Sequence, residues 1–472
     1  MRKIQTCLFL SCVLIAISNL SCSSIRSTSG RGGLSEVKVS SLTGLQSAID
    51  AAKPGTRIVV ADGIYSSTGA IHVACAGTAE RPIVIAAETR DGAEITGKAG
   101  FELVRPAAYV TIEGFKFTHA VEGEQINVGA NHCRYSRNVF QNPGLGYELL
   151  VSGDDAQIDR NCFQNKFAGG QMVYVQGPGT SGMAQRTWIH LNLFTNYPDT
   201  HQNNCSAIQI GLSGRSMTAA HSLVESNLFI RCRGENENIC NKSCENTYRY
   251  NTFEDNCSEL SLRHGNDNIV YGNFFIGTDG LRMFGKRDKI YSNFFESCNR
   301  GIHIGNGDGV IPPSKLTSHD RPDGMQIVYN TIINCNNSLM MARRNRGLGA
   351  TNITFADNII VGKGRLINIE GPITHSVWEG NILWGETNGL TADMAAGFKV
   401  VDPKLKRDAN GEYHLSAGSP AVGAGVGSFP YVTVDMDGQP RGVKMDVGAD
   451  QISKAPVINR ILTVADVGPN AP

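Results

Sequence analysis

An asparagine followed two positions later by an aromatic or aliphatic residue recurs along most of this chain. The motif occurs in segments such as RNVF, SNLF, GNFF and DNII, and its asparagines are Asn138, Asn161, Asn192, Asn227, Asn251, Asn273, Asn293, Asn330, Asn358 and Asn381. Many of these asparagines are 20 to 24 residues apart, and the remaining intervals are 28 to 37 residues long. Such a period is typical of a solenoid, in which each repeat forms one coil and contacts only its neighbours. We therefore expect one long repeat domain.

The stretch before the first of these asparagines consists of short alternating or β-branched runs bounded by Gly, Asp or Asn. Examples are TRIVVADGIYSS, PIVIAAE, YVTIEGFKF and QINVG. Helical periodicity is found in LTGLQSAIDAA, where Ser41 or Thr43 would begin one short amphipathic helix. Strands without intervening helices favour an all-β fold over βαβ units.

These patterns predict a single-stranded right-handed parallel β-helix with a short N-terminal capping helix. Each coil would supply about three strands, and equivalent positions of successive coils would stack about 4.8 Å apart. An inward asparagine at a turn can then bond the coils above and below it, while the Phe, Leu or Ile two places later fills the interior. We interpret all ten repeat asparagines as structural.

The N-terminus, MRKIQTCLFLSCVLIAISNLSC, has a basic start and then an apolar run from Cys7 to Ile17. This run is too short to cross a bilayer and is typical of a secretory signal, which we place at residues 1–21. Cys22 resembles the lipid-attachment cysteine of a bacterial lipoprotein. We expect an exported protein that is periplasmic, secreted, or attached to the outer membrane through a lipidated Cys22.

Changes in composition suggest the remaining boundaries. The Ser/Gly-rich residues 22–34 would form a flexible tether, and residues 35–395 the β-helix domain. A Pro-, Gly- and Asp-rich closing segment would follow at residues 396–452, and a short tail at residues 453–472. The chain has 43 basic and 43 acidic residues, so the strongly basic character of most nucleic-acid-binding proteins is missing and we expect no nucleic-acid partner.

Ten of the 13 cysteines lie beyond Cys22. Cys232, Cys257 and Cys298 follow a repeat asparagine by five or six residues, so we expect buried, stacked thiols there. Cys240 and Cys244 have no matching second pair and no nearby histidine, so they are not predicted to bind zinc.

Chemically useful residues gather between Asn227 and Gly277. Glu235 and Glu237 are two positions apart, so on an extended strand their carboxylates leave the same face. Lys242 and Arg263 are 21 residues apart, close to one repeat, which places them on neighbouring coils of one surface. On composition alone, an exposed glutamate pair beside a lysine is more often a solvated face.

The block GENENICNKSCEN, followed by LSLRHGNDN and GLRMFGKRDKIYSNFF, resembles polysaccharide lyase family 6, which holds chondroitinase B and many alginate lyases. The resemblance extends from GTRIVVADGIY to SPAVGAG. It implies a calcium-dependent lyase that cleaves uronic-acid polysaccharides by β-elimination. It also implies that Lys242 is the base and Arg263 the acid, and that Asn203, Glu235 and Glu237 are calcium ligands.

The chemistry of elimination agrees with these residue types. Removing the C5 proton of a uronate builds a second negative charge beside its carboxylate, and Ca²⁺ held by oxygen ligands would neutralise that charge. Lys242 can take the proton only when it is neutral, and nearby Ca²⁺ and Arg263 would lower its pKa. Arg263 can donate a hydrogen bond to the departing C4 oxygen.

Four further residues are candidates for binding an anionic polysaccharide: His264, Arg282, Arg343 and Arg344. Each has a structural alternative, namely a hydrogen-bonded histidine, a surface ion pair, or solvated arginines. Residues 280–305 look more like the alginate lyases, so alginate is the favoured substrate. The Arg343–Arg344 pair keeps dermatan sulfate open, because paired arginines suit sulfate groups.

Two other classes remain open at this stage. One is a β-helix that binds a polysaccharide without cutting it. The other is a pectate lyase or glycoside hydrolase on the same architecture. A hydrolase needs two carboxylates flanking the bond, and Glu235 and Glu237 on one strand face are better placed as joint metal ligands.

Overall fold

The computed structural model describes residues 35–120, 123–199, 202–310 and 319–472. The predicted signal, Cys22 and the predicted tether therefore lie outside the described residues. No helix within the described ranges combines the length and the apolar character that a membrane span requires.

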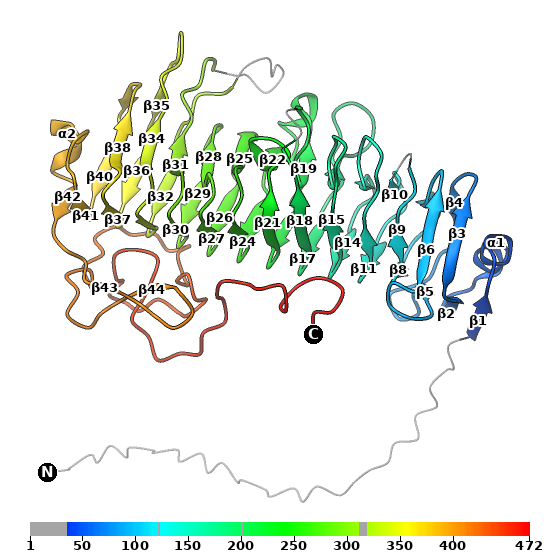
Figure 1. Ribbon diagram of the computed structural model, residues 1–472. Helices are drawn as coiled ribbons and strands as arrows, with labels where there is room; N and C mark the ends of the chain where they lie inside the picture. Colours follow the sequence, from blue (N-terminus) through cyan, green and yellow to red (C-terminus); the bar gives the residue numbers. More distant parts are fainter. Residues whose placement is uncertain (1–34, 121–122, 200–201, 311–318) are drawn as a thin grey trace, which may run out of the picture. The chain divides into compact units, whose positions relative to one another are not determined.

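Three long parallel sheets make up the fold, and each coil contributes one strand to each sheet in turn (Figure 1). The first sheet contains β1 (Ser35–Val39), β2 (Thr56–Val60), β5 (Ile83–Ala87), β8 (Val110–Glu113), β11 (Arg134–Ser136), β14 (Gln157–Asp159), β17 (Trp188–His190), β20 (Leu223–Glu225), β23 (Thr247–Arg249), β26 (Ile269–Tyr271), β29 (Lys289–Tyr291), β32 (Gln326–Val328), β36 (Thr354–Ala356) and β40 (Val377–Glu379). The second contains β3 (Gly63–Ser67), β6 (Ala93–Gly97), β9 (Lys116–Phe117), β12 (Val139–Phe140), β15 (Cys162–Gln164), β18 (Leu193–Tyr197), β21 (Leu228–Cys232), β24 (Thr252–Glu254), β27 (Phe274–Ile276), β30 (Phe294–Glu296), β33 (Thr331–Ile333), β37 (Ile359–Gly362), β41 (Asn381–Gly385) and β42 (Phe398–Val400).

The third sheet carries the candidate site. It contains β4 (Ile71–Val73), β7 (Phe101–Leu103), β10 (Glu124–Ile126), β13 (Leu149–Val151), β16 (Val173–Val175), β19 (Ile208–Gly211), β22 (Glu237–Lys242), β25 (Glu259–His264), β28 (Leu281–Met283), β31 (Arg300–Ile304), β34 (Asn337–Met341) and β38 (Arg365–Ile369). Two small pairs, β35 (Ala350–Thr351) with β39 (Ile373–Thr374) and β43 (Leu405–Arg407) with β44 (Tyr413–Leu415), lie outside the three sheets. The predicted parallel β-helix is confirmed.

One α-helix, α1 (Leu42–Ala51), covers the N-terminal end of the coils, as predicted (Figure 1). Ser41 caps it, since its side chain accepts a hydrogen bond from the Gly44 N–H. Leu45 and Ile49 are buried in the main core. The other helical segments in the described ranges are a 3-10 turn at Ser213–Arg215 and the short α2 (Ala392–Ala395).

The ten repeat asparagines form a continuous ladder inside the stack, and all of them are fully buried. The backbone N–H of each of the first nine donates to the Oδ1 of the next coil's asparagine, at 2.9 to 3.1 Å, and that of Asn381 donates to the Gly397 carbonyl. Beside the ladder, the rings of Phe140, Phe163, Phe194, Phe229, Phe253, Phe275 and Phe295 stack with centroid separations of 4.4 to 4.9 Å. Both structural predictions made from the repeat are confirmed.

We expect Asn227→Ala to lower the free energy of unfolding by about 2–4 kcal/mol. The Oδ1 of Asn227 accepts from both the backbone N–H and the side chain of Asn192, and its Nδ2 donates to three oxygens. Each buried group left without a partner costs about 1–3 kcal/mol. Urea unfolding measures the loss, and the exposed Asn388→Ala is the matched control. Equal stabilities of the two variants would contradict the structural role of the ladder.

One cysteine prediction is wrong. Cys232 and Cys298 are buried, but Cys257 is exposed. The inward position of that coil belongs to Asn256, whose Oδ1 accepts the Cys232 N–H and whose Nδ2 donates to the Phe229 carbonyl. The next side chain along the chain therefore points outward. No disulfide joins any two cysteines of the described residues.

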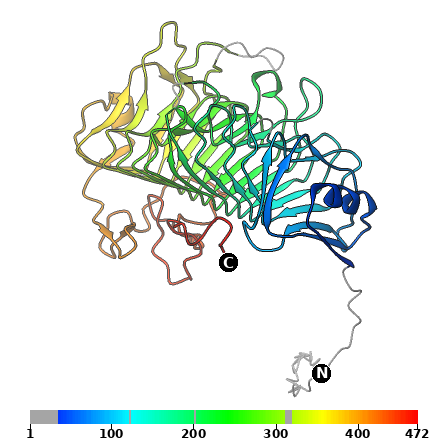
Figure 2. The same ribbon diagram turned by 45° about the vertical axis from the view of Figure 1, so that its right-hand side comes forward.

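After the last coil the chain turns back and runs along the outside of the coils toward the N-terminal half (Figures 1 and 2). We call residues 402–472 the returning segment. The Ser292 hydroxyl donates to the Val434 carbonyl at 2.9 Å, and the Gly468 N–H donates to the Leu191 carbonyl at 2.8 Å. The predicted tail is part of this segment and lies against the coils.

Candidate active site

The candidate residues lie on the outer face of the third sheet. Leu260, Leu281 and Ile302 occupy matching positions on β25, β28 and β31 and point into the core. The residues that follow them, Ser261, Arg282 and His303, are also in register and form a row on the opposite face. Cys240 on β22 and Gln209 on β19 extend the same row.

Two irregularities in the pairing of β22 with β25 change which side chains meet. Glu237 pairs with Glu259, but the next partners are Ile239 and Leu260, so Asn238 is an extra residue. At the other end, Asn241 pairs with Leu262 and Lys242 with His264, so Arg263 is also extra. β-Bulges re-aim side chains and are common next to active sites. Lys242 and Arg263 thus lie on adjacent paired strands, one coil apart.

The Glu235 carboxylate, which precedes β22, is held by the loop before β19. Its Oε1 accepts the Cys205 N–H and the Ser206 hydroxyl, both at 2.9 Å, and its Oε2 accepts the Asn204 N–H at 3.1 Å. Burial raises the pKa of Glu235, and the negative charge of Glu237 raises it further. The loop also brings the exposed Asn203 to this end of the site.

Glu237 is buried and bound by two arginines. Arg263 Nη1 lies 3.1 Å and Arg282 Nη2 2.5 Å from its Oε1, so Oε2 takes part in neither contact. Burial alone would raise the pKa of Glu237, but Arg282 and Arg263 outweigh burial and lower it. Glu237 is therefore an anion in the folded protein.

Arg282 joins Glu237 to a second buried carboxylate, Glu259, which lies 2.7 Å from its Nε. We call these three residues the Glu237–Arg282–Glu259 cluster. Burial raises the pKa of Glu259 to about 7, although Arg282 and Arg300 oppose the shift. The guanidinium of Arg282, a predicted substrate-binding residue, thus binds two carboxylates of the protein itself, and its side chain is only 17% exposed.

Lys242 ends β22 and is 9% exposed. Its Nζ makes no hydrogen bond or ion pair within the ranges that the structure describes. The strand beside it must pass very close, because a Cβ on Gly211 would lie 2.2 Å from the Lys242 carbonyl oxygen. Arg263 is more accessible, with 37% of its side chain exposed. Burial alone would lower the pKa of Arg263, but Glu237 raises it.

The donor atoms at Glu235, Glu237 and Asn203 fit a hard divalent cation. All are oxygens, which Ca²⁺ prefers. The two carboxylates lie near enough for one to raise the pKa of the other, and a cation between them would relieve this repulsion. Glu237 also keeps an oxygen that neither arginine uses.

Hollows flank these residues along the third sheet. One, of about 400 Å³, is lined by Tyr174, Gln209, Asn203 and Asn204. Another, of about 170 Å³, is lined by Arg282, His303, Arg343 and Arg344. Three of the four predicted substrate-binding residues therefore share one hollow.

The basic residues of the smaller hollow differ in their surroundings. Arg344 is held by Asp308 at 2.6 Å and His319 at 3.0 Å. Arg343 is exposed, and its side chain forms no ion pair in the described part of the chain. His264 is buried, with its ring centroid 5.8 Å from that of His319.

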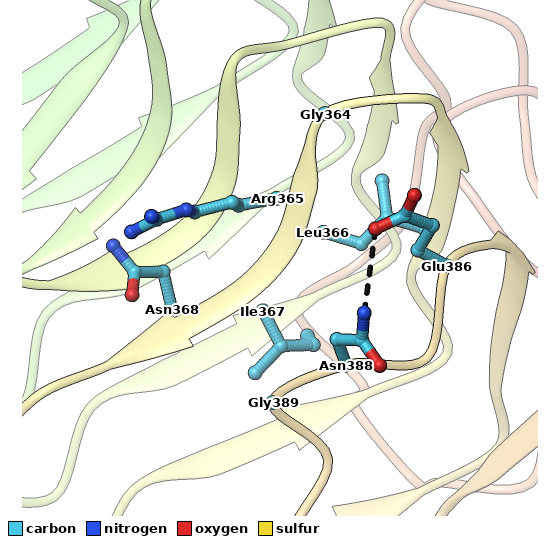
Figure 3. Close-up of a pocket in the computed structure, with 8 residues that line it drawn as sticks. All are labelled: Gly364, Arg365, Leu366, Ile367, Asn368, Glu386, Asn388 and Gly389. Carbon is cyan, nitrogen blue, oxygen red and sulfur yellow. Dashed lines mark hydrogen bonds between the residues drawn. The ribbon is translucent and has the colours of Figure 1, made fainter.

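A third hollow, of about 270 Å³, lies farther along the same sheet (Figure 3). Arg365 and Asn368 line it from β38, and Glu386 and Asn388 from the turn after β41. It is several coils away from Lys242, so it does not belong to the candidate active site.

We expect His303 to make the protein less stable in acid. Burial, with Arg282 and Arg300, lowers the pKa of His303 to about 3, against an ordinary value of 6.5. Between these values the unfolded chain binds the extra proton, so the free energy of unfolding falls as pH falls, by up to about 1.4 kcal/mol per pH unit. In urea unfolding at pH 7.5 and 5, His303→Gln should lose part of this slope, whereas the exposed His375→Gln should keep it. Identical slopes would contradict the prediction.

Sequence reasoning missed Glu259 and His319. Glu259 lies 22 residues after Glu237, so the spacing argument that linked Lys242 to Arg263 would also have found it. His319 offered no comparable signal, because it follows a long insertion between β31 and β32.

The fold and this face define a parallel β-helix protein with paired carboxylates and basic residues clustered on one sheet. A family model described as Chondroitinase B matches residues 39–377. The match covers more than half of the chain, and the chain belongs to this family, the polysaccharide lyase family 6 group that the sequence blocks resemble.

Several solved structures have a similar fold. A mannuronic acid specific polysaccharide family 6 lyase from human gut microbiota is 25% identical, with a TM-score of 0.68 over 78% of this chain and 91% of that chain. The PL6 family alginate lyase AlyGC is 24% identical, with a TM-score of 0.74 over 90% of this chain and 60% of that chain. A PL6 alginate lyase in complex with a trisaccharide is 18% identical, with a TM-score of 0.70 over 93% and 95%. The chain thus spans about 60% of the length of AlyGC. No curated protein sequence matched significantly.

Proposed function

We propose that this chain is a calcium-dependent polysaccharide lyase that cleaves alginate by β-elimination and releases unsaturated oligosaccharides. The observation that carries the proposal is the grouping of four side chains along β22 and β25: Glu235 just before β22, Glu237 and Lys242 on β22, and the partly exposed Arg263 on β25. In the described residues the Lys242 amine has no ion-pair partner. The family membership and the alginate lyases among similar structures support the same activity.

Each residue has a role that follows from its surroundings. When held by oxygens of Glu235, Glu237 and Asn203, calcium supplies positive charge that neutralises the uronate carboxylate and stabilises the enolate. Lys242 accepts the C5 proton on its Nζ, which contacts no carboxylate of the described residues. The electron pair of the broken C5–H bond then forms the C4–C5 double bond, and the C4–O bond breaks.

Arg263 stabilises the departing C4 oxygen. Its exposed part can donate a hydrogen bond to that oxygen, while Glu237 orients the guanidinium. Because Glu237 raises the pKa of Arg263, the guanidinium keeps its proton. Water therefore supplies the proton that the leaving oxygen takes up.

The hollow lined by Arg282, Arg343 and Arg344 favours a second candidate substrate, dermatan sulfate. A bidentate arginine suits a sulfate group, and Arg343 is exposed and unpaired among the described residues. The other arginines there are already bound by carboxylates, which weakens this candidate.

We expect the ultraviolet absorbance of unsaturated uronate to rise when the protein is mixed with alginate, and to stay flat with dermatan sulfate. A calcium chelator should abolish the rise in absorbance, because Glu235 and Glu237 then lack their cation. Added Ca²⁺ should restore it. A rise with dermatan sulfate and none with alginate would show that dermatan sulfate, and not alginate, is the substrate. No rise on either polymer, with polymer still bound, would leave a non-catalytic binding protein.

A further inference from the structure

A second group of ligating side chains lies on the returning segment, far from Lys242 in the sequence. His414 is on β44, and Asp408 and Glu412 belong to the turn that joins β43 to β44. Asp437 and Asp450 come from two later turns of the same segment. Figure 1 shows the β43–β44 hairpin outside the three sheets.

His414 lies between four carboxylates without a short hydrogen bond to any of them. Its Nδ1 is 3.6 Å from Asp437 Oδ2 and 3.5 Å from Asp450 Oδ1, and its Nε2 is 3.6 Å from Asp408 Oδ2 and 3.8 Å from Glu412 Oε2. Charge-assisted hydrogen bonds are about 2.7–2.9 Å long. A tetrahedral metal with bonds of about 2.0–2.1 Å holds its ligand atoms roughly 3.3 Å apart, which is closer to the spacing at Nδ1.

A second observation, the burial of Asp437, favours a bound cation. Asp437 is 2% exposed, and its Oδ1 is buried with no hydrogen-bond partner. Among the described residues, neither Asp437 nor Asp450 forms an ion pair with lysine or arginine, and His414 is the basic group that faces both. A buried carboxylate without a full counter-charge is costly, so such groups are usually paired or bound to a metal.

The remaining contacts hold the ligands in place. Asp450 Oδ2 accepts the Leu415 N–H at 2.6 Å, which leaves its Oδ1 facing His414. The backbone N–H of Asp437 donates to Asp435 Oδ1 at 3.0 Å. Such outer contacts fix the orientation of metal ligands.

We propose that His414, Asp437 and Asp450 bind a divalent transition-metal cation of the zinc type. Their ligand atoms lie within 4.8 Å of one another. Imidazole nitrogen with two carboxylates suits zinc better than calcium, which prefers oxygen alone. The bound metal joins the β43–β44 hairpin to the turns at Asp437 and Asp450 and so stabilises the returning segment.

The test uses the tag-free full chain, stripped of metal by a chelator and titrated with Zn²⁺ in a calorimeter. We expect a site that Asp437→Asn weakens at least tenfold and that the exposed Asp393→Asn leaves unchanged. The site should persist in Glu235→Gln, which separates it from the candidate active site. Zn²⁺ bound at this site should also raise the unfolding temperature of the protein.

Co²⁺ gives a second readout. Its visible absorption should change on binding to the wild type and not to His414→Gln, which decides the matter if Asp437→Asn does not fold. Absence of Zn²⁺ binding to the wild type, or equal binding to Asp437→Asn, would overturn the proposal. Neither result depends on whether the chain cleaves alginate.

Discussion

Replacement of Lys242 by alanine is expected to lower kcat on alginate by about 10²–10⁴-fold, the range that positioned general bases contribute. Lys242 is the amine of the site that no carboxylate engages in the described residues. Its loss removes the acceptor of the C5 proton without breaking an ion pair. Initial rates of unsaturated product formation measure the effect.

The exposed Lys399→Ala on β42 is the matched control and should keep full activity. Polymer binding and the unfolding temperature of Lys242→Ala should stay close to those of the wild type. A Lys242→Ala variant with undiminished kcat would require a different base.

Replacement of Arg282 by methionine is expected to lower the free energy of unfolding by about 3–5 kcal/mol, because it leaves Glu237 and Glu259 as buried carboxylates with one counter-charge fewer. Adding Glu259→Gln should recover much of this loss, since a neutral amide needs no counter-charge. Urea unfolding of the two single variants and the double variant gives the coupling energy.

Arg343→Met is the control from the same hollow. Arg343 is exposed, so we expect the free energy of unfolding of Arg343→Met to differ from that of the wild type by no more than about 0.5 kcal/mol. Any effect of this substitution should be a change in KM. If Arg282→Met were as stable as Arg343→Met and only KM rose, Arg282 would be a substrate contact instead of the centre of an ion-pair cluster.

The fold was predictable because the same residue types recur at the same positions of successive coils. Each repeat asparagine sits at the same turn and each following apolar residue points inward, so the spacing alone predicts the ladder and the ring stack. Cys257 was misplaced because it was positioned by distance from Asn251. The neighbouring Asn256 bonds to the previous coil, which reverses the side that Cys257 faces.

The sequence predicted which coils carry the candidate site residues, but not which of these residues contact one another. Spacing placed Lys242 and Arg263 on adjacent coils and predicted Glu235 and Glu237 on one strand, but in the structure only Glu237 is on β22, and Glu235 lies in the bend before it. The two bulges could not be read from spacing, because an extra residue in a strand leaves the period within its ordinary variation. Next to these bulges Glu237 contacts both arginines, and Lys242 forms no ion pair with any residue that the structure describes.

The sequence by itself determined the β-helix, its asparagine ladder and the coils that carry the candidate catalytic residues, since each of these follows from contacts between neighbouring repeats. Only the tertiary structure decided which charges pair. Glu237, Arg282 and Glu259 come from three coils, and Asp437 and Asp450 reach His414 from separate turns. Such pairings depend on register and on the path of the returning segment, and neither is encoded at a fixed spacing.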